Sequence, residues 1–446
     1  MDKATNGTYP SSEVTANGGR GLSKSTGTIY QYTVDGDNYY LSATSTAAGS
    51  SASYISSVTG TVMDGVWSEH LAPGQSPWQR VAVGDYHACG IGSNGLGYCW
   101  GASNRIGNNT GAGSLVPTPI YTSGPLNGKT LVDIRASQDH TCALTSEGLA
   151  YCWGSNNQGW LGNNTTSGPD SPTSLYMTGA LNGLTIKKIA SQYYHGCVVA
   201  SDDNVYCFGR NVEGQLGNGN NTQSNAPVAV DRSGVLSGKT VKMIADGRSY
   251  AHTCVIASDN KGYCWGWNYA GQLGNSSAVD SNVPVAVNMT GVLSGKTLKT
   301  IVSGQGHTCA IATDDLLYCW GNYAVGSSTS PAAVTTGLLS GKTFTFLAAG
   351  ENSTCAIASS GSAYCWGQNN GGQFGDGTTT GGNPTAVDMT GALSGKTLRS
   401  IATCSTHTCA VASDNKAYCW GQNNAGQLGD NSTSVSLVPV ATTTLP

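Results

Sequence analysis

The chain has 446 residues, of which 62 are glycine and only 10% are charged, a composition typical of a turn-rich β protein. Its net charge is -4, and the sequence shows no cluster of Lys and Arg of the kind that binds a phosphate backbone. Both features argue against DNA or RNA as a partner. No apolar run reaches the ~18 residues that a membrane-spanning helix needs.

Residues 1–70 contain no cysteine and stand apart from the rest of the chain. Segments 30–34 and 38–43 alternate around "DGD", which is a hairpin turn signal, and a third strand fits 52–58. The Asp-Gly pair is more often a simple turn than a calcium site. We therefore predict a small β-rich segment, too short to hold a hydrophobic core alone.

This segment resembles the C-terminal globular half of bacterial type IV pilins and pseudopilins. In those proteins a G-x-Y-P turn follows a long N-terminal helix, and "GTYP" stands at 7–10 here. The resemblance implies a helix upstream of Met1 that has been removed, and contacts with pilin-like filament subunits. The alternative is an ordinary β-rich linker domain. Because polar residues follow Met1 at once, we interpret the chain as a trimmed or mature segment without its signal.

Fourteen of the fifteen cysteines form seven pairs with one spacing, and the pairs recur every 46 to 57 residues. A period near fifty marks a repeat architecture. Each copy contains an alternating segment, a Cys hairpin, a "GQLG"-type loop and a "VPVAV"-type segment, which together suggest four short strands. Seven such units predict an all-β fold, a seven-bladed β-propeller over residues 71–446.

The phrase "HTCALTSEGLAYCWG" at 140–154 indicates what each cysteine pair does. A tight turn at 146–148 places Cys142 opposite Cys152, with Cα atoms about 4.5 Å apart, within disulfide range. Zinc would need four ligands, whereas each copy supplies at most three, and copy six has Ser353 in place of the histidine. Reduced structural cysteines are the other alternative. We predict one disulfide-stapled hairpin per blade and an oxidising compartment. The predicted pairs are Cys89–Cys99, Cys142–Cys152, Cys197–Cys207, Cys254–Cys264, Cys309–Cys319, Cys355–Cys365 and Cys409–Cys419.

Other polar motifs carry no chemistry of their own in our interpretation. The histidine that precedes each hairpin recurs six times, so we expect it to be structural and to bond a neighbouring strand beside a glycine. Cys404 is unpaired; it is either a free thiol or an intermolecular link, and we favour a buried, inert thiol. The repeated "SGKT" turns lack the spacing and the following helix of a phosphate-binding loop. We predict no metal and no cofactor.

The stretches "IASQYYHGCVVASDDNVYCFGRNVEGQLGNG" and "HTCVIASDNKGYCWGWNYAGQLGNS" resemble the repeats of the regulator of chromosome condensation family. The resemblance covers about residues 78–446 and implies a seven-bladed propeller. It implies no single activity, because members include exchange factors, a secreted β-lactamase-inhibiting protein and a plant ultraviolet receptor. The chain departs from the nuclear members by its cysteine pairs and by lacking their basic elements, which argues against chromatin binding and nucleotide exchange.

Three functions are compatible with these features. We expect a non-enzymatic bacterial binding or adhesion module, extracellular or at the cell surface, that engages a protein or glycan at one propeller face. The alternative is a secreted inhibitor or regulator of an extracellular enzyme. The third is a glycan-acting enzyme, which would need acidic residues at one mouth of the channel. Trp160, Trp267 and Tyr269 lie beside GQLG loops and are the candidate contacts.

Overall fold

The computed structural model describes residues 78–121 and 123–445 throughout, together with the backbone of six strands before residue 58. The chain divides into two compact units, Met1–Gln75 and Ser76–Pro446. Each unit is described by itself below. Within the described residues, no helix combines the length and the apolar character needed to cross a bilayer.

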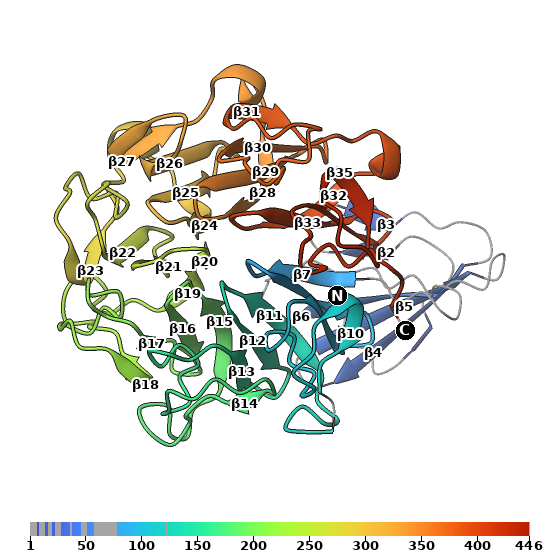
Figure 1. Ribbon diagram of the computed structural model, residues 1–446, viewed down its shortest axis with the longest axis horizontal. Coiled ribbons are helices and arrows are strands. Elements are labelled where there is room, and N and C mark those ends of the chain that lie inside the picture. The colour runs from blue at the N-terminus through green and yellow to red at the C-terminus, as the bar shows by residue number, and fades with distance from the viewer. Residues whose placement is uncertain are drawn as a thin grey trace. The chain divides into compact units, whose positions relative to one another are not determined.

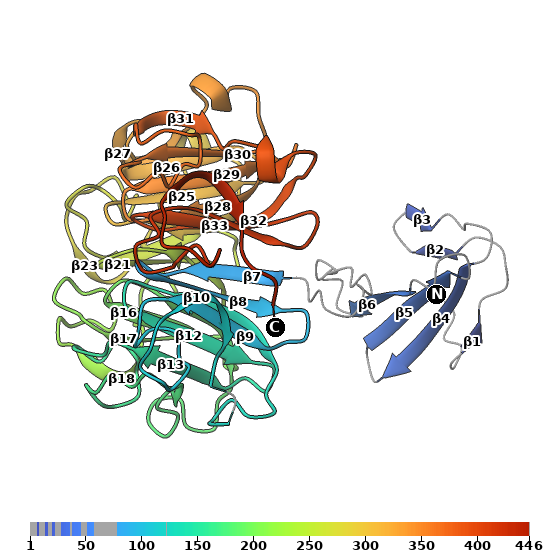
Figure 2. The same ribbon diagram turned by 45° about the vertical axis from the view of Figure 1, so that its right-hand side comes forward.

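The first unit contains a four-stranded antiparallel sheet in the order β1-β4-β5-β6 (Figure 2). The strands expected at 30–34, 38–43 and 52–58 are found in β4 (Thr28–Asp35), β5 (Asn38–Ser45) and β6 (Ser51–Ser57). The short β1 (Gly7–Thr8) pairs with β4, and β2 (Val14–Ala16) pairs with β3 (Arg20–Leu22). Residues 9–10 of the "GTYP" turn and residues 36–37 of "DGD" lie outside the described residues, so the pilin-like identity stays a prediction.

The second unit is the predicted seven-bladed propeller (Figure 1). Each blade is a four-stranded antiparallel sheet whose strands follow chain order, with the first strand nearest the axis and the fourth outermost. The strands of blades one to four are β7 (Trp78–Val83), β8 (His87–Gly92), β9 (Gly97–Gly101) and β10 (Ser114–Pro119); β11 (Leu131–Ala136), β12 (His140–Thr145), β13 (Ala150–Gly154) and β14 (Thr173–Ser174); β15 (Ile186–Ser191), β16 (His195–Ala200), β17 (Val205–Gly209) and β18 (Ser224–Ala229); β19 (Val241–Ile244), β21 (His252–Ala257), β22 (Gly262–Gly266) and β23 (Ser281–Ala286). The strands of blades five to seven are β24 (Leu298–Ser303), β25 (His307–Ala312), β26 (Leu317–Asn322) and β27 (Ser327–Ala333); β28 (Phe344–Ala349), β29 (Ser353–Ala358), β30 (Ala363–Gly367) and β31 (Gly382–Ala386); β32 (Leu398–Thr403), β33 (His407–Ala412), β34 (Ala417–Gly421) and β35 (Ser436–Ala441).

The cysteine hairpins have the predicted register. Cys142 lies opposite Cys152, and His140 lies opposite Gly154. In the described part of the chain, all seven predicted pairs are disulfides with Cα atoms 4.0–4.1 Å apart. The alternative of reduced cysteines is therefore wrong for these pairs, and the zinc alternative is wrong because both sulfurs of each pair are bonded to one another.

Hydrophobic cores lie between blades, because a single twisted sheet cannot bury both of its faces alone. In each core the disulfide of one blade packs against the aromatic residues of the next. Cys197 and Cys207 of blade three, for example, share a core with Tyr263 and Trp265 of blade four. The stapled face of one blade thus meets the aromatic face of its neighbour.

The ring closes by packing of blade seven against blade one, because every blade is built from consecutive strands. The backbone N–H of Trp78 donates to the carbonyl of Asn415 at 2.9 Å. The indole Nε1 of Trp100 donates to the carbonyl of Gln427, also at 2.9 Å. The core at this seam includes Cys409 and Cys419. No strand of the described residues is exchanged between these two blades.

The outermost strands are protected against pairing with other chains. A buried proline lies within or directly before each of the seven fourth strands. Proline has no backbone N–H to donate, so it interrupts the ladder that an added strand would need. The seven residues are Pro117, Pro172, Pro227, Pro284, Pro331, Pro384 and Pro439.

Candidate functional site

One end of the propeller, here called the turn face, carries the parts of the chain that vary most between blades. Within each hairpin the start of the second strand lies opposite the end of the third, as His87 lies opposite Gly101. The turns before the second strands and the loops after the third strands therefore share this end. The turns are 84–86, 137–139, 192–194, 248–251, 304–306, 350–352 and 404–406. The opposite end is here called the lysine face.

A histidine begins the second strand of six blades and ties it to the next blade. The Nε2 of His252 lies 2.9 Å from the hydroxyl of Thr308, and that of His307 lies 2.8 Å from Thr354. A Cβ at Gly304 would collide with the His307 imidazole, whereas blade four has Ser249 in that position and its hydroxyl contacts His252 instead. The prediction of structural histidines is confirmed at both positions, and the predicted glycine beside the ring is found at His307.

Two histidines lack the threonine partner and bond elsewhere. Blade three has Gly196 in that position, and His140 contacts the hydroxyl of Ser191 at 2.9 Å instead. Blade one has Ala88, and the Nδ1 of His407 lies 3.1 Å from the Cys404 sulfur. Burial lowers the pKa of His407 to about 3, so the imidazole is neutral at physiological pH. None of these groups is poised for proton transfer.

One arginine of blade four reaches across the turn face to blade one. The turn between Ile244 and His252 is two residues longer than the one between Ile134 and His140. The extra residues form β20 (Asp246–Gly247), which pairs in parallel with β24 of blade five. Gly247 has φ 137°, and a Cβ there would collide with the Ser303 carbonyl. This insertion directs Arg248 across the axis.

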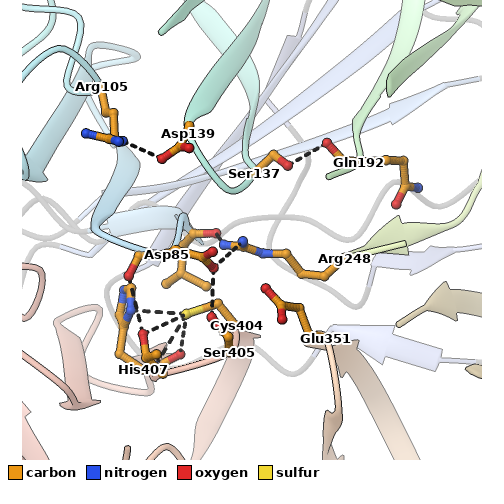
Figure 3. Close-up of polar contacts among 12 residues, drawn as sticks. Asp85, Arg105, Ser137, Asp139, Gln192, Arg248, Glu351, Cys404, Ser405 and His407 are labelled. Carbon is orange, nitrogen blue, oxygen red and sulfur yellow. Dashed lines mark hydrogen bonds and ion pairs between the residues drawn. The ribbon is translucent and has the colours of Figure 1, made fainter. Parts of the chain in front are cut away.

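Arg248 connects three blades through Asp85. Its guanidinium donates to the Asp85 carboxylate at 2.7 Å and to the Val83 carbonyl at 2.6 Å, and its side chain is only 2% exposed. Ser405 of blade seven donates its hydroxyl to the same carboxylate at 2.9 Å (Figure 3). Burial by itself lowers the pKa of Arg248, but the combined attraction of Asp85 and the smaller contributions of Cys404, Glu351 and Tyr193 raises it above its ordinary value.

Glu351 of blade six lies beside this ion pair, as Figure 3 shows, and is half-buried. Its carboxylate accepts a hydrogen bond of 3.1 Å from the hydroxyl of Tyr250. Among the described residues, no lysine or arginine forms an ion pair with it. Burial and the nearby Asp85 carboxylate raise the pKa of Glu351, although Arg248 and Tyr250 oppose them.

An aromatic cluster spans blades two to four on the turn face. The ring of Tyr193 lies 4.5 Å from that of Tyr194 and 4.0 Å from that of Tyr250, measured between centroids. Trp160 extends the cluster, 5.3 Å from Tyr194. Tyr193 and Trp160 are buried, whereas Tyr194 and Tyr250 are half-buried and keep part of each side chain in contact with solvent. The cluster therefore offers two tyrosine rings to solvent on a rigid base.

The two ends of the propeller differ in their cationic residues. The turn face carries Arg105, Arg210 and Arg248 and, within 78–121 and 123–445, no lysine. Every lysine of those ranges lies in the segments entering the first strands, at the start of those strands or in the hairpin turns, all at the lysine face. These are Lys129, Lys187, Lys188, Lys239, Lys242, Lys261, Lys296, Lys299, Lys342, Lys396 and Lys416.

The "SGKT" lysines are structural. The Nζ of Lys296 lies 5.5 Å from the centroid of the Tyr318 ring, and that of Lys342 lies 5.1 Å from Tyr364. The Tyr318 hydroxyl in turn donates to Asp314 at 2.6 Å. These lysines cover the hairpin tyrosines, which agrees with our rejection of a phosphate-binding loop.

The three predicted contact residues occupy different environments. Trp160 stands where other blades have the glutamine of GQLG, and at 6% exposed it offers little surface to a partner. Tyr269 is 80% exposed, and Trp267 is half-buried. Of the three, Tyr269 has the side chain most available for contact.

Cys404 is the one free cysteine of the described residues, and it is buried. Burial raises the pKa of its thiol to about 11. It occupies the position that Ser249 holds in blade four, where the hydroxyl lies 2.7 Å from the Nδ1 of His252. Cys404 makes the equivalent contact to His407, so its environment is that of a structural, inert thiol.

The sequence interpretation did not find the channel cluster. Arg248 and Asp85 are far apart in the chain, and no spacing rule joins them. The longer turn between Ile244 and His252 was a usable signal, since an insertion in one repeat of seven marks a blade that differs. The consecutive tyrosines Tyr193 and Tyr194 were a second such signal.

Comparisons with known proteins agree with this architecture. Models of the regulator of chromosome condensation (RCC1) repeat match residues 131–159, 186–215, 344–373 and 399–427, and residues 202–256, 259–311 and 414–446. The ultraviolet-B receptor UVR8 of Arabidopsis thaliana is 30% identical over 242 residues, which cover 54% of this chain and 52% of the receptor. The human E3 ubiquitin-protein ligase HERC2 is 29% identical over 353 residues, 77% of this chain but 7% of the ligase.

Among solved structures, yeast RCC1 (Prp20) bound to Kap60 superposes with a TM-score of 0.64 at 19% identity, covering 84% of this chain and 85% of that one. At this identity the superposition shows a common fold. The chain spans about half the length of the plant receptor and a small part of the ligase. The repeat matches and the seven blades together establish that this chain belongs to the regulator of chromosome condensation (RCC1) repeat family.

Proposed function

We propose that this protein is a non-catalytic, extracellular binding module whose protein partner docks on the turn face. RCC1-like propellers are a protein-binding and regulatory fold, as their presence in a receptor and in a ligase illustrates. The observation that carries the proposal is the difference between the two ends. The turn face combines Tyr, Trp and Arg without lysine, and protein interfaces are enriched in the former and depleted of the latter.

The extracellular location is supported by the disulfides. All seven are buried in the blade cores, and such bonds persist in oxidising compartments. We include in the proposal that the unit Met1–Gln75 displays the propeller on a pilin-like filament. This part rests on the "GTYP" resemblance.

The arrangement at the channel mouth favours binding over catalysis on glycans. Among the described residues, five carboxylates lie on the innermost strands, on β20 or in the turns that follow them, namely Asp85, Asp133, Asp139, Asp246 and Glu351. Asp133 pairs with Arg80 and Arg135, and Arg135 also pairs with Asp246. Asp139 pairs with Arg105. Asp85 is held in a buried ion pair with Arg248, and Glu351 accepts the Tyr250 hydroxyl. A glycosidase needs one free carboxylate and one protonated carboxylic acid flanking the scissile bond.

Site-specific photo-crosslinking tests the proposal. A photoreactive residue at Tyr269 or Val212 on the turn face is compared with one at Lys261 or Lys416 on the lysine face, in extracellular medium and at the cell surface. We expect the same partner from both turn-face positions and its loss when unlabelled protein competes. Equal capture from both faces would refute turn-face docking. A captured hydrolase that loses activity on binding would indicate the inhibitor role instead of adhesion.

A further inference from the structure

The centre of the turn face presents a carboxylate beside aromatic rings. Tyr250 is half-buried, and its hydroxyl donates a hydrogen bond of 3.1 Å to the Glu351 carboxylate. Its ring is supported from below by the buried Tyr193, 4.0 Å away between centroids, and Tyr194 lies 5.6 Å from it. The three rings are tilted relative to one another. A carboxylate beside the face of an aromatic ring is an arrangement that recognises cations.

Tyrosine rings of this face already hold cations within the molecule. The guanidinium of Arg210 lies 5.5 Å from the centroid of Tyr194, and that of Arg105 lies 5.5 Å from Tyr86. Both charges are paired, Arg210 with Glu213 at 2.7 Å and Arg105 with Asp139 at 2.6 Å. Tyr250 differs because no lysine or arginine of the described residues lies over its ring.

The charges around this position leave one negative charge without a counterpart. Asp85 and Arg248 neutralise one another, and Ser405 contributes a neutral hydroxyl. Glu351 is then the remaining charged group, half-buried and so only partly screened by water. A cationic group of a binding partner would neutralise the Glu351 carboxylate.

We propose that Tyr250 and Glu351 form a receptor for one cationic side chain of the docking partner. The occupant is the ammonium of a lysine, free or methylated, or the guanidinium of an arginine, seated over the Tyr250 ring with its charge toward Glu351. The inference rests on the proposed function, since it identifies one anchor of the partner on the turn face.

Choline and its neutral isostere 3,3-dimethylbutan-1-ol test the site without the partner. Both are titrated into the full chain by ligand-observed NMR. The two probes have nearly the same shape and differ in charge, so we expect choline to bind about five- to thirty-fold more tightly, the range of a cation–π contact. Equal binding of the two probes, or no binding of choline, would overturn the inference.

Three variants locate the effect. Glu351→Gln removes the charge at constant shape, and Tyr250→Phe keeps the ring but removes the hydroxyl that orients Glu351; both are expected to lower the preference for choline at least threefold. Glu147→Gln, on the lysine face, is the matched control and leaves the preference unchanged. An unchanged preference in both turn-face variants would overturn the site. The crosslinking experiment is independent, because a partner can dock on this face without using this anchor.

Discussion

The guanidinium of Arg248, in blade four, donates to the carboxylate of Asp85, in blade one, at 2.7 Å across the channel axis. The two residues belong to blades that share no core. The contact therefore adds a direct link across the ring to the links between adjacent blades.

Breaking this ion pair from one side should be costly. Arg248→Met leaves the Asp85 carboxylate buried without its partner, and we expect a loss of about 3–5 kcal/mol in the free energy of unfolding. Asp85→Asn combined with Arg248→Met removes both charges and should recover most of that loss. Denaturant unfolding with intact disulfides measures both. Lys187→Met is the control, because its solvent-exposed pair with Asp203 is worth less than about 1 kcal/mol; an equal loss in both single variants would contradict the buried-pair interpretation.

The buried histidines should make the propeller sensitive to acid. Burial lowers the pKa of His307 to about 4, below its ordinary value of 6.5. The neutral His307 imidazole therefore contributes fully to the free energy of unfolding above pH 6.5. This contribution is lost as the pH falls toward 4, because the unfolded chain takes up a proton that the folded chain does not. Each such histidine adds a slope of about 1.4 kcal/mol per pH unit in that window. Unfolding free energies measured from pH 7 to pH 4.5 report the slope.

Blade six provides a matched pair for this prediction. It has Ser353 at the histidine position, and Gly350 precedes it as Gly304 precedes His307. We expect His307→Gln to reduce the number of protons taken up on unfolding by one, and Ser353→His to increase that number by one, with the slope changing in proportion. Parallel pH profiles for both variants and the parent chain would show that these histidines do not control acid unfolding.

The disulfides predict a simple thiol count. The denatured, unreduced chain should expose one alkylatable thiol, Cys404, and the reduced chain should expose fifteen. Mass spectrometry after alkylation measures both. Each hairpin bond closes a loop of about ten residues, so replacing Cys142 and Cys152 by alanine should cost about 2–3 kcal/mol. Fourteen or fifteen reactive thiols before reduction would contradict the oxidising compartment.

Cys404 should be replaceable by serine but not by alanine. Serine makes the equivalent contact in blade four, so Cys404→Ser should change the unfolding free energy by less than about 1 kcal/mol, whereas Cys404→Ala leaves a buried imidazole nitrogen unpaired at a cost of about 1–3 kcal/mol. Burial raises the pKa of the Cys404 thiol from 9.0 to about 11. The protonated thiol therefore contributes fully to the free energy of unfolding below pH 9, and this contribution is lost as the pH rises through 11. Thermal unfolding of the two variants from pH 7 to pH 11 tests both statements; similar losses in both would refute them.

The sequence predicts features that recur in every repeat. The register of Cys142 and Cys152 follows from alternation along a strand, and the structural role of the histidines follows from their recurrence before six of the seven hairpins. Both depend on neighbours within one or two blades, so local spacing is sufficient. The seven blades follow from counting one pair per repeat.

Features that occur once were missed for a physical reason. The contact of Arg248 with Asp85 depends on how the ring closes, which no local pattern encodes. Trp160 was predicted to be a contact residue because it lies beside a GQLG-type loop, yet it is buried at the glutamine position between His140 and Tyr194. The loop after the third strand of blade five spans only residues 323–326, against 267–280 in blade four. A consequence of this short loop was also missed, since Trp366 Nε1 lacks the carbonyl acceptor that Trp320 finds in Gln272.

The disulfides lie within hairpins, and the seam between blades seven and one is held by side-chain packing and hydrogen bonds alone. Within the described propeller no covalent bond joins blade seven to blade one, and Arg248 of blade four adds a non-covalent contact with blade one. Pulling the two ends of the propeller apart should open the seam first and leave each stapled hairpin intact. That seam is the one junction between neighbouring blades that the described chain does not cross, so it can separate and close again without breaking a covalent bond.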